Sequence, residues 1–174
     1  LYLKKLLVGG YPKVYEIGRK FRNEGIDTTH NPEFTMLESN EAYVDAKHQR
    51  EFIEALFKAL VLKLFGKATI VYDGQEINFE PAFQVISFYD LIRRHALISN
   101  PESIPREELI LRAKQLGVAV DDSDAHEKIL DNVYKKTCRP KLIQPTFIID
   151  YPVSFNPFAK RKEGDATLID RFQL

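Results

Sequence analysis

The sequence lacks the features that mark several specialised protein classes. A single cysteine among 174 residues, Cys138, excludes a disulfide framework or a cysteine-based zinc cluster within the chain and suits a reducing compartment. Lysine and arginine number 25, as do aspartate and glutamate, so no overall basic charge indicates a nucleic-acid-binding protein. We expect neither a membrane span nor a secretory leader, because no apolar run is long enough to span a bilayer and no basic-then-apolar segment begins the sequence. Any contact with a polyanion must then be local.

Familiar phosphate-binding and nucleophilic motifs are also missing. Neither G-x-x-x-x-G-K-[ST] nor G-x-G-x-x-G occurs in the chain. Cys138 has no neighbouring catalytic-histidine motif, so we interpret it as a partly buried thiol. His48, His95 and His126 fall on expected helices among charged residues, which favours a solvated face. The basic run at 160–162 could touch a phosphate backbone, although runs this short usually face water.

Hydrophobic spacing indicates a mixed α+β chain. Residues 13–43 alternate in strand fashion around a polar connection, which predicts two long antiparallel strands joined by a loop. Residues 45–65 carry apolar side chains at helical spacing and stop at Gly66, which predicts a helix whose apolar stripe packs in the core. The Asp73-Gly74 turn then predicts a short hairpin.

The second half of the chain has mainly helical sequence patterns. Ser87 and Asp90 resemble a capping box that begins a helix, and a further helix is expected between Pro105 and Gly117. Another helix is expected from Ser123. The expected buried side of that helix comprises Ile129, Leu130 and Val133. Residues 146–150 form a strand that returns the chain to the sheet. Residues 87–142 are therefore interpreted as a small helical insertion.

One face of the two long strands combines polar groups with Phe and Met. The residues that share this face on the second strand are Phe34, Met36, Glu38 and Asn40. Arg22 ends the first strand, and with His30 in the loop it could bind an anion, because a guanidinium is always charged and can form two parallel hydrogen bonds. Phe34 could take a base ring, and Glu38 could hold a cationic group.

These residues by themselves leave two interpretations open. The first is a site for a nucleotide and an amine. The second is structural: Arg and Glu on facing strands commonly form an ion pair on a solvated face, a lone loop histidine is commonly structural, and a lone Phe is commonly core.

A longer match separates the two interpretations. The run VYEIGRKFRNEGIDTTHNPEFTMLE at 14–38 closely resembles motif 2 of class II aminoacyl-tRNA synthetases, in the form found in lysyl-tRNA synthetases. FRNEG and HNPEFTM match letter for letter, and LYLKKLLVGG, LIQPTFIIDYPV and NPFAKR extend the resemblance across the chain. The resemblance implies an antiparallel sheet flanked by helices, with the helical insertion at about 87–142.

The resemblance also implies a reaction and its partners. Lysine is activated by ATP to lysyl-adenylate and transferred to tRNA(Lys), with Mg²⁺ as cofactor, by a cytoplasmic homodimer. Residues 1–174 would be part of the catalytic domain, with motif 1, motif 3 and the anticodon-binding domain outside this chain. We therefore expect these residues by themselves to be inactive.

Roles for individual residues follow from the same resemblance. Arg22 would be catalytic, binding the α-phosphate and the lysine carboxylate. Glu24 and Asn31 would lie by the adenine, His30 would reach the terminal phosphates, and Phe34 would stack on the ring. The residues implied in lysine binding are Met36, Glu38 and Asn40.

Three positions depart from the family pattern, and one of them is Asn156, which stands where serine is usual. Asn40 stands where the family usually has a lysine-contacting Tyr, and Gln173 stands where it usually has a metal-contacting Glu. Two other functions remain as alternatives: a paralogous lysyltransferase that modifies a protein side chain, and a non-catalytic binding module of the same fold. An aspartate- or asparagine-specific relative is disfavoured, because Glu38 suits a cationic amino acid.

Overall fold

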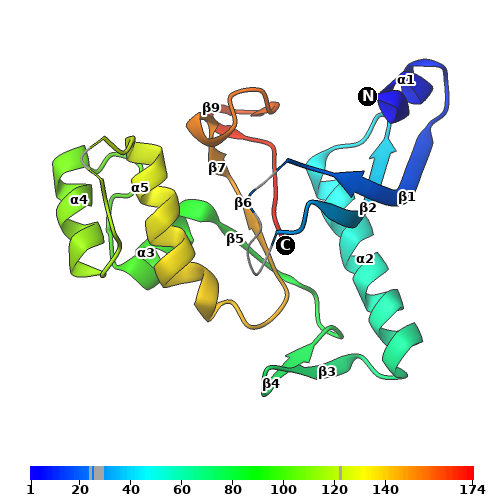
Figure 1. The fold of residues 1–174 in the computed structure, drawn as a ribbon, viewed down its shortest axis with the longest axis horizontal. Helices are drawn as coiled ribbons and strands as arrows, with labels where there is room; N and C mark the ends of the chain where they lie inside the picture. The colour runs from blue at the N-terminus through cyan, green and yellow to red at the C-terminus, as the bar shows by residue number, and fades with distance from the viewer. Residues whose placement is uncertain (24, 26–29, 122) are drawn as a thin grey trace. The chain divides into compact units, whose positions relative to one another are not determined.

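The computed structural model describes residues 1–23, 25, 30–121 and 123–174. The chain forms two compact units, Leu1–Asp45 and Ala46–Leu174 (Figure 1), and each is described by itself. Helices and strands both occur, in agreement with the expected α+β class. Within the described residues, no helix is both long and apolar enough to cross a membrane.

The first unit is built on one long hairpin. Its elements are α1 (Tyr2–Val8), β1 (Lys13–Phe21) and β2 (Glu33–Glu41). The antiparallel register runs from Lys13 opposite Glu41 to Phe21 opposite Glu33, which confirms the two predicted strands. The Arg22 backbone N–H donates to the Pro32 carbonyl at 2.9 Å and extends the pairing by one residue toward the loop.

The second unit begins with α2 (Ala46–Phe65), which confirms the predicted helix. The chain leaves it through Gly66, whose φ of 70° suits a residue without Cβ and whose N–H donates to the Leu62 carbonyl. The prediction that the apolar stripe of α2 packs in the core is wrong. Only Val61 is buried, whereas Leu64 is 71% exposed, because no described element of the second unit covers most of the stripe.

The predicted Asp73-Gly74 hairpin is confirmed. It joins β3 (Thr69–Tyr72) to β4 (Gln75–Asn78), and both turn residues have positive φ, as a two-residue turn of this kind requires. Ile70 faces Ile77 and Tyr72 faces Gln75, as the turn predicts.

The next two strands differ from the expected antiparallel arrangement. β5 (Gln84–Ser87) and β6 (Thr146–Ile149) pair in parallel. A parallel neighbour needs a long crossover connection, and the helices between these two strands provide it. The described strands fall into four separate hydrogen-bonded sheets.

The crossover is helical throughout its regular elements. These are α3 (Phe88–Ala96), α4 (Arg106–Gln115), α5 (His126–Val133), the π-helical turn η1 (Tyr134–Cys138) and the 3₁₀ turn η2 (Arg139–Lys141). Ser87 caps α3, since its Oγ accepts from the Asp90 N–H at 3.1 Å, which confirms the predicted start. Buried side chains of these helices form one core with residues of the following strands. The predicted buried side of α5 (Ile129, Leu130 and Val133) is confirmed.

Two details of this region correct the sequence expectations. α5 begins at His126 and not at Ser123, because the Asp121 carboxylate accepts from the Ser123 N–H and hydroxyl and holds those residues in a turn. Cys138 is fully buried, not partly buried, and its thiol donates to the Leu91 carbonyl at 3.5 Å. Burial raises the pKa of the Cys138 thiol.

The chain ends in a small three-stranded sheet. Its elements are β7 (Tyr151–Pro152), the 3₁₀ turn η3 (Val153–Phe155), β8 (Arg161–Lys162) and β9 (Asp165–Ile169). Lys162 forms an ion pair with Asp150 at 2.6 Å, and the Arg161 guanidinium donates to the Ala166 carbonyl at 2.7 Å. Two of the three cations in the 160–162 run thus form contacts with nearby residues of the same unit.

Candidate functional site

The register of the long hairpin places the predicted site residues of β2 on one face of the hairpin. Gly18 lies opposite Met36 and Lys20 lies opposite Phe34, so alternate residues of both strands point the same way. Side chains of this face on β2 are half-buried, whereas Tyr15 on the other face is exposed. The structure therefore brings the predicted β2 residues together along one strand face.

Arg22 and Phe34 meet at the loop end of this face. The centre of the Arg22 guanidinium lies 5.3 Å from the centroid of the Phe34 ring, within cation–π range. The backbone pairing of Arg22 with Pro32 fixes the position from which the guanidinium reaches the ring. A positive charge thus lies beside a half-buried aromatic ring.

Carboxylates concentrate farther along the same face. Glu16 and Glu38 are direct cross-strand partners, an arrangement that is unfavourable between like charges. Lys20 neutralises Glu16 through an ion pair at 2.7 Å. The Glu38 carboxylate accepts one long hydrogen bond, from the Asn40 side-chain amide at 3.4 Å, and pairs with no cation among the described residues. This end of the face is therefore suited to an added positive charge.

The remaining predicted residues of the hairpin lie in its connection. His30 and Asn31 lie before Pro32 and the start of β2, and both are exposed. Glu24 lies outside the described residues. About 14 Å of extended strand, at roughly 3.4 Å per residue, separates Phe34 from Glu38. One strand face can thus offer a positive and aromatic end and a negative end to one extended ligand.

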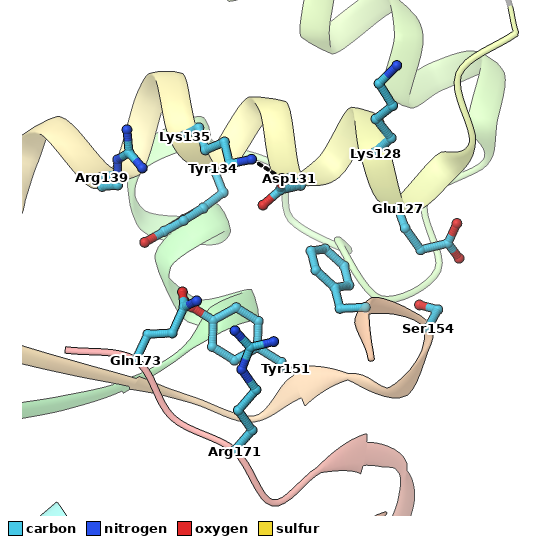
Figure 2. Close-up of a pocket in the computed structure, with 11 residues that line it drawn as sticks. Glu127, Lys128, Asp131, Tyr134, Lys135, Arg139, Tyr151, Ser154, Arg171 and Gln173 are labelled. Atoms are coloured by element: carbon cyan, nitrogen blue, oxygen red, sulfur yellow. Dashed lines mark hydrogen bonds and ion pairs between the residues drawn. The ribbon is translucent and has the colours of Figure 1, made fainter. Parts of the chain in front are cut away.

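Gln173 belongs to the second unit, where its backbone forms an isolated antiparallel β-bridge with Ile148. It lines a cavity of about 480 Å³. Figure 2 shows its side chain beside Tyr151, facing the helix that carries Tyr134 and Arg139. Its side-chain carbonyl accepts from the Tyr151 hydroxyl at 2.7 Å, and burial raises the pKa of that hydroxyl. The Arg171 guanidinium lies 5.5 Å from the Tyr151 ring centroid.

Sequence reasoning did not find Tyr151 or Arg171. Arg171 and Gln173 alternate along the last segment, which is a strand-like signal, but two residues are too few to distinguish it from chance. Tyr151 lies beside a proline in a segment that the sequence marks as a loop.

The described residues contain no cluster of metal-ligating side chains. Among them, no group of three or more His, Cys, Asp or Glu side chains lies close enough to hold a metal ion. Magnesium prefers several oxygen ligands, commonly including a carboxylate. Gln173 provides one neutral oxygen, and that oxygen already accepts the Tyr151 hydroxyl hydrogen bond.

Comparison with known proteins places the whole chain in one family. The family model "tRNA synthetases class II (D, K and N)" matches residues 1–174. A lysine–tRNA ligase of Pelotomaculum thermopropionicum is 45% identical over 176 residues, covering 100% of this chain and 35% of that protein. A lysine–tRNA ligase of Roseiflexus sp. is 42% identical, covering 99% and 35%. One from Aquifex aeolicus is 41% identical, covering 100% and 29%.

The chain spans about a third of the length of these curated relatives. The match to the family model nevertheless runs from the first residue to the last. The chain therefore belongs to the class II tRNA synthetases of the aspartate, lysine and asparagine group.

Proposed function

We propose that the protein containing this chain is a lysine–tRNA ligase. It activates lysine with ATP to lysyl-adenylate and transfers the lysyl group to tRNA(Lys). The observation that carries this proposal is one strand face with a guanidinium against an aromatic ring at one end and an unneutralised carboxylate, Glu38, at the other. A nucleotide and a cationic amino acid match these two ends.

Arg22 is the proposed catalytic residue. A lysine carboxylate oxygen attacks the α-phosphorus, the bond to the bridging oxygen breaks, and pyrophosphate leaves. The attacking carboxylate is already ionised at neutral pH, so the step needs no general base. It needs two anions held together and neutralisation of the charge that develops between them. One planar guanidinium can bridge carboxylate and phosphate.

The proposed nucleotide contacts surround Arg22. Phe34 stacks on the adenine, Glu24 and Asn31 lie beside it, and His30 reaches the terminal phosphates. A base on Phe34 would bring its α-phosphate toward the guanidinium, because the two side chains are 5.3 Å apart. ATP is the proposed substrate with Mg²⁺ as its counter-ion. Within this chain, the charge neutralisation is assigned to Arg22.

Lysine is proposed to bind farther along β2. Glu38 offers a carboxylate without a cationic partner among the described residues, and Met36 offers an apolar surface for the lysine stem. Asn40 contributes an amide that already contacts Glu38. An aspartate substrate would place a second negative charge beside Glu38, which disfavours that specificity.

The wider setting is proposed on the same basis. The chain is part of a catalytic domain with an antiparallel sheet flanked by helices and a helical insertion at about 87–142. Motif 1, motif 3 and an anticodon-binding domain belong to other parts of the protein, which functions as a cytoplasmic homodimer.

The test is lysine-dependent exchange between ATP and pyrophosphate on the full-length protein. Arg22→Ala should lower kcat by about 10²- to 10³-fold, as removal of one transition-state donor does in other enzymes. Arg19→Ala is the matched control. Arg19 lies on the opposite face of β1 and pairs at 3.4 Å with Glu33, so its removal should leave exchange unchanged.

Three results would contradict the proposal. Absence of exchange with every amino acid would leave a binding module of the same fold. Exchange with aspartate or asparagine would assign a different substrate. Lysine-dependent exchange without charging of tRNA(Lys) would indicate a lysyltransferase with another acceptor.

A further inference from the structure

One cavity of the second unit carries positive charge that the proposed function does not use. It is the cavity of about 480 Å³ that Gln173 lines, and its volume is typical of a site for a small molecule. Arg139, on η2, and Arg171, after β9, both line it. The residues proposed to contact lysine and the nucleotide, including Arg22 and Glu38, belong to the first unit. The cavity is therefore a candidate site for a separate ligand.

The Arg171 guanidinium keeps its hydrogen-bond donors available. It is half-buried, and its centre lies 5.5 Å from the Tyr151 ring centroid, within cation–π range (Figure 2). That contact involves no oxygen acceptor, so the five N–H donors of the side chain still need partners. Among the residues that the structure describes, none accepts a hydrogen bond from them or forms an ion pair with them. A half-buried cation without acceptors is unfavourable until a ligand supplies them.

The surface beside Arg171 is rigid. Tyr134 and Tyr151 are 5% and 3% exposed, and Phe88 packs against both rings, with centroid separations of 5.4 and 5.1 Å. The Tyr151 hydroxyl donates to the Gln173 side-chain carbonyl at 2.7 Å, which fixes the orientation of the amide. The NH₂ group of that amide is a donor. A surface that is ordered in this way loses little conformational entropy when a ligand binds.

Arg139 lies at the same part of the cavity as Gln173. Tyr134, Arg139 and Gln173 line this cavity and also a second one of about 470 Å³, so these side chains lie at the boundary that the two cavities share. Arg171 approaches the same region through its contact with the Tyr151 ring, whose hydroxyl binds Gln173. Two guanidiniums from distant parts of the sequence thus line one end of the cavity.

The carboxylates of the cavity do not neutralise this end. Asp131 pairs with Lys135 at 2.6 Å, so its charge is already compensated. Glu127 lies about 18 Å before Arg139 along the helical path, at roughly 1.5 Å per residue. Arg139 forms no ion pair with any carboxylate in the part of the chain that the structure describes. The end of the cavity that contains the two arginines is therefore positively charged.

We propose that this cavity binds the phosphoryl group of a small phosphorylated molecule. Arg139 and Arg171 bind the phosphoryl oxygens, and the Gln173 amide donates to the same group. A carboxylate has two oxygens and can be satisfied by one guanidinium, whereas a phosphate monoester has three terminal oxygens and matches two. The rest of the cavity has room for the organic part of the molecule. The site lies in a different unit from the proposed lysine and nucleotide contacts, and the proposal does not depend on them.

The test is isothermal titration calorimetry on the full-length protein. One probe is glycerol 3-phosphate, a phosphate monoester, and the other is succinate, a dicarboxylate of similar charge. We expect saturable binding of the phosphate monoester and much weaker binding of succinate. Arg139→Gln should weaken binding of the phosphate monoester by about 10- to 150-fold, because it removes a charge-assisted contact.

Three further variants make the test specific. Arg171→Lys keeps the charge but loses the planar fork, so it should also weaken binding. Arg112→Gln is the matched control, since Arg112 is an exposed guanidinium on α4 that does not line the cavity. Arg22→Ala removes the proposed phosphate contact of the first unit. The last two variants should bind glycerol 3-phosphate as the unaltered protein does. Arg139 is exposed, so Arg139→Gln should fold even if Arg171→Lys does not.

Several results would overturn the proposal. One is the absence of saturable binding up to about 10 mM glycerol 3-phosphate, since any weaker association is negligible. Equal affinity for succinate would overturn the phosphoryl assignment. An equal loss in Arg112→Gln would show that the binding is not specific to the cavity. Loss in Arg22→Ala without loss in Arg139→Gln would place the binding in the first unit. Lysine-dependent exchange is measured separately, and its absence would overturn the proposed function but not this site.

Discussion

The hairpin unit and the helical part of the second unit use their side chains in opposite ways. Among the described residues of the first unit, Leu3 is the one apolar side chain in the buried core. In the second unit, Phe88, Leu91 and Ile129 are completely inaccessible to solvent. The residues assigned to chemistry lie on the first unit and those that hold a core together lie on the second. Function and stability are thus largely separated along this chain.

The comparison has a physical basis. Polar groups such as Arg22 and Glu38 remain hydrated on a strand face until a ligand replaces the water, and burial without partners would destabilise the fold. Apolar side chains gain about 25 cal/mol per Å² on burial, which favours their concentration in one closed cluster. Substitutions in the two units should therefore affect different measurements.

The largest expected effect is on stability, from Phe88→Ala. The Phe88 ring packs against four aromatic rings, those of Tyr89, Tyr134, Tyr151 and Phe155. Truncation should lower the free energy of unfolding by about 3–5 kcal/mol, since the cavity cannot easily collapse. Urea unfolding of the full-length protein measures it. Tyr72→Ala, at a ring that is 72% exposed, is the control, and a similar loss there would contradict the separation.

An intermediate effect is expected on lysine binding, from Glu38→Gln. The change removes the charge but keeps the shape, so stability should stay the same. Loss of a charge-assisted contact of about 1.5–3 kcal/mol should raise the KM for lysine roughly 10- to 150-fold, with little change for ATP. Glu33→Gln, on the opposite face of β2, provides the matched control. An equal change in the KM for ATP would show that Glu38 does not act on lysine alone.

The smallest expected effect is at the start of α3, from Ser87→Ala. Loss of the N-cap should destabilise the protein by about 1 kcal/mol and leave lysine-dependent exchange intact. The Ser87 hydroxyl also donates to Asp90 at 2.7 Å, and this hydrogen bond is the main reason that the pKa of Asp90 is lowered. A change in exchange activity would contradict the separation of the two units.

Because its pKa is lowered, the contribution of Asp90 to the stability of the fold should depend on pH. A carboxyl whose pKa is lower in the folded state stabilises the fold above its unfolded pKa, near 4, and this contribution is lost as pH falls through the folded value. The difference in unfolding midpoint between the unaltered protein and Asp90→Asn should therefore disappear in acid. A difference that persists there would show that the charge of Asp90 is not its cause.

Elements with strong local signals were predictable. The alternation at 13–43 gave the β1–β2 pair, Asp73-Gly74 gave the short hairpin with its register, and Ser87 gave the start of α3. In each case a short-range rule decides the structure, because the interacting groups lie close together in sequence. The face shared by Phe34, Met36, Glu38 and Asn40 followed from the same rule.

Elements that depend on distant neighbours were not predictable. The stripe of α2 has the spacing of a core helix, yet its exposure depends on which other segments cover it. The parallel pairing of β5 with β6 depends on how a long crossover folds. The start of α5 was displaced by the Asp121 turn, in which side-chain hydrogen bonds compete with helix formation.

The sequence by itself determined the family, the hairpin, and the strand face on which Arg22 and Glu38 would act. These follow from residue identity and from the two-residue repeat of a strand, which need no knowledge of packing. Tertiary structure alone decided that β5 lies parallel to β6 and that Tyr151 and Gln173 share a cavity. Those proximities arise when segments far apart in the chain bury a common core, and local spacing does not encode them.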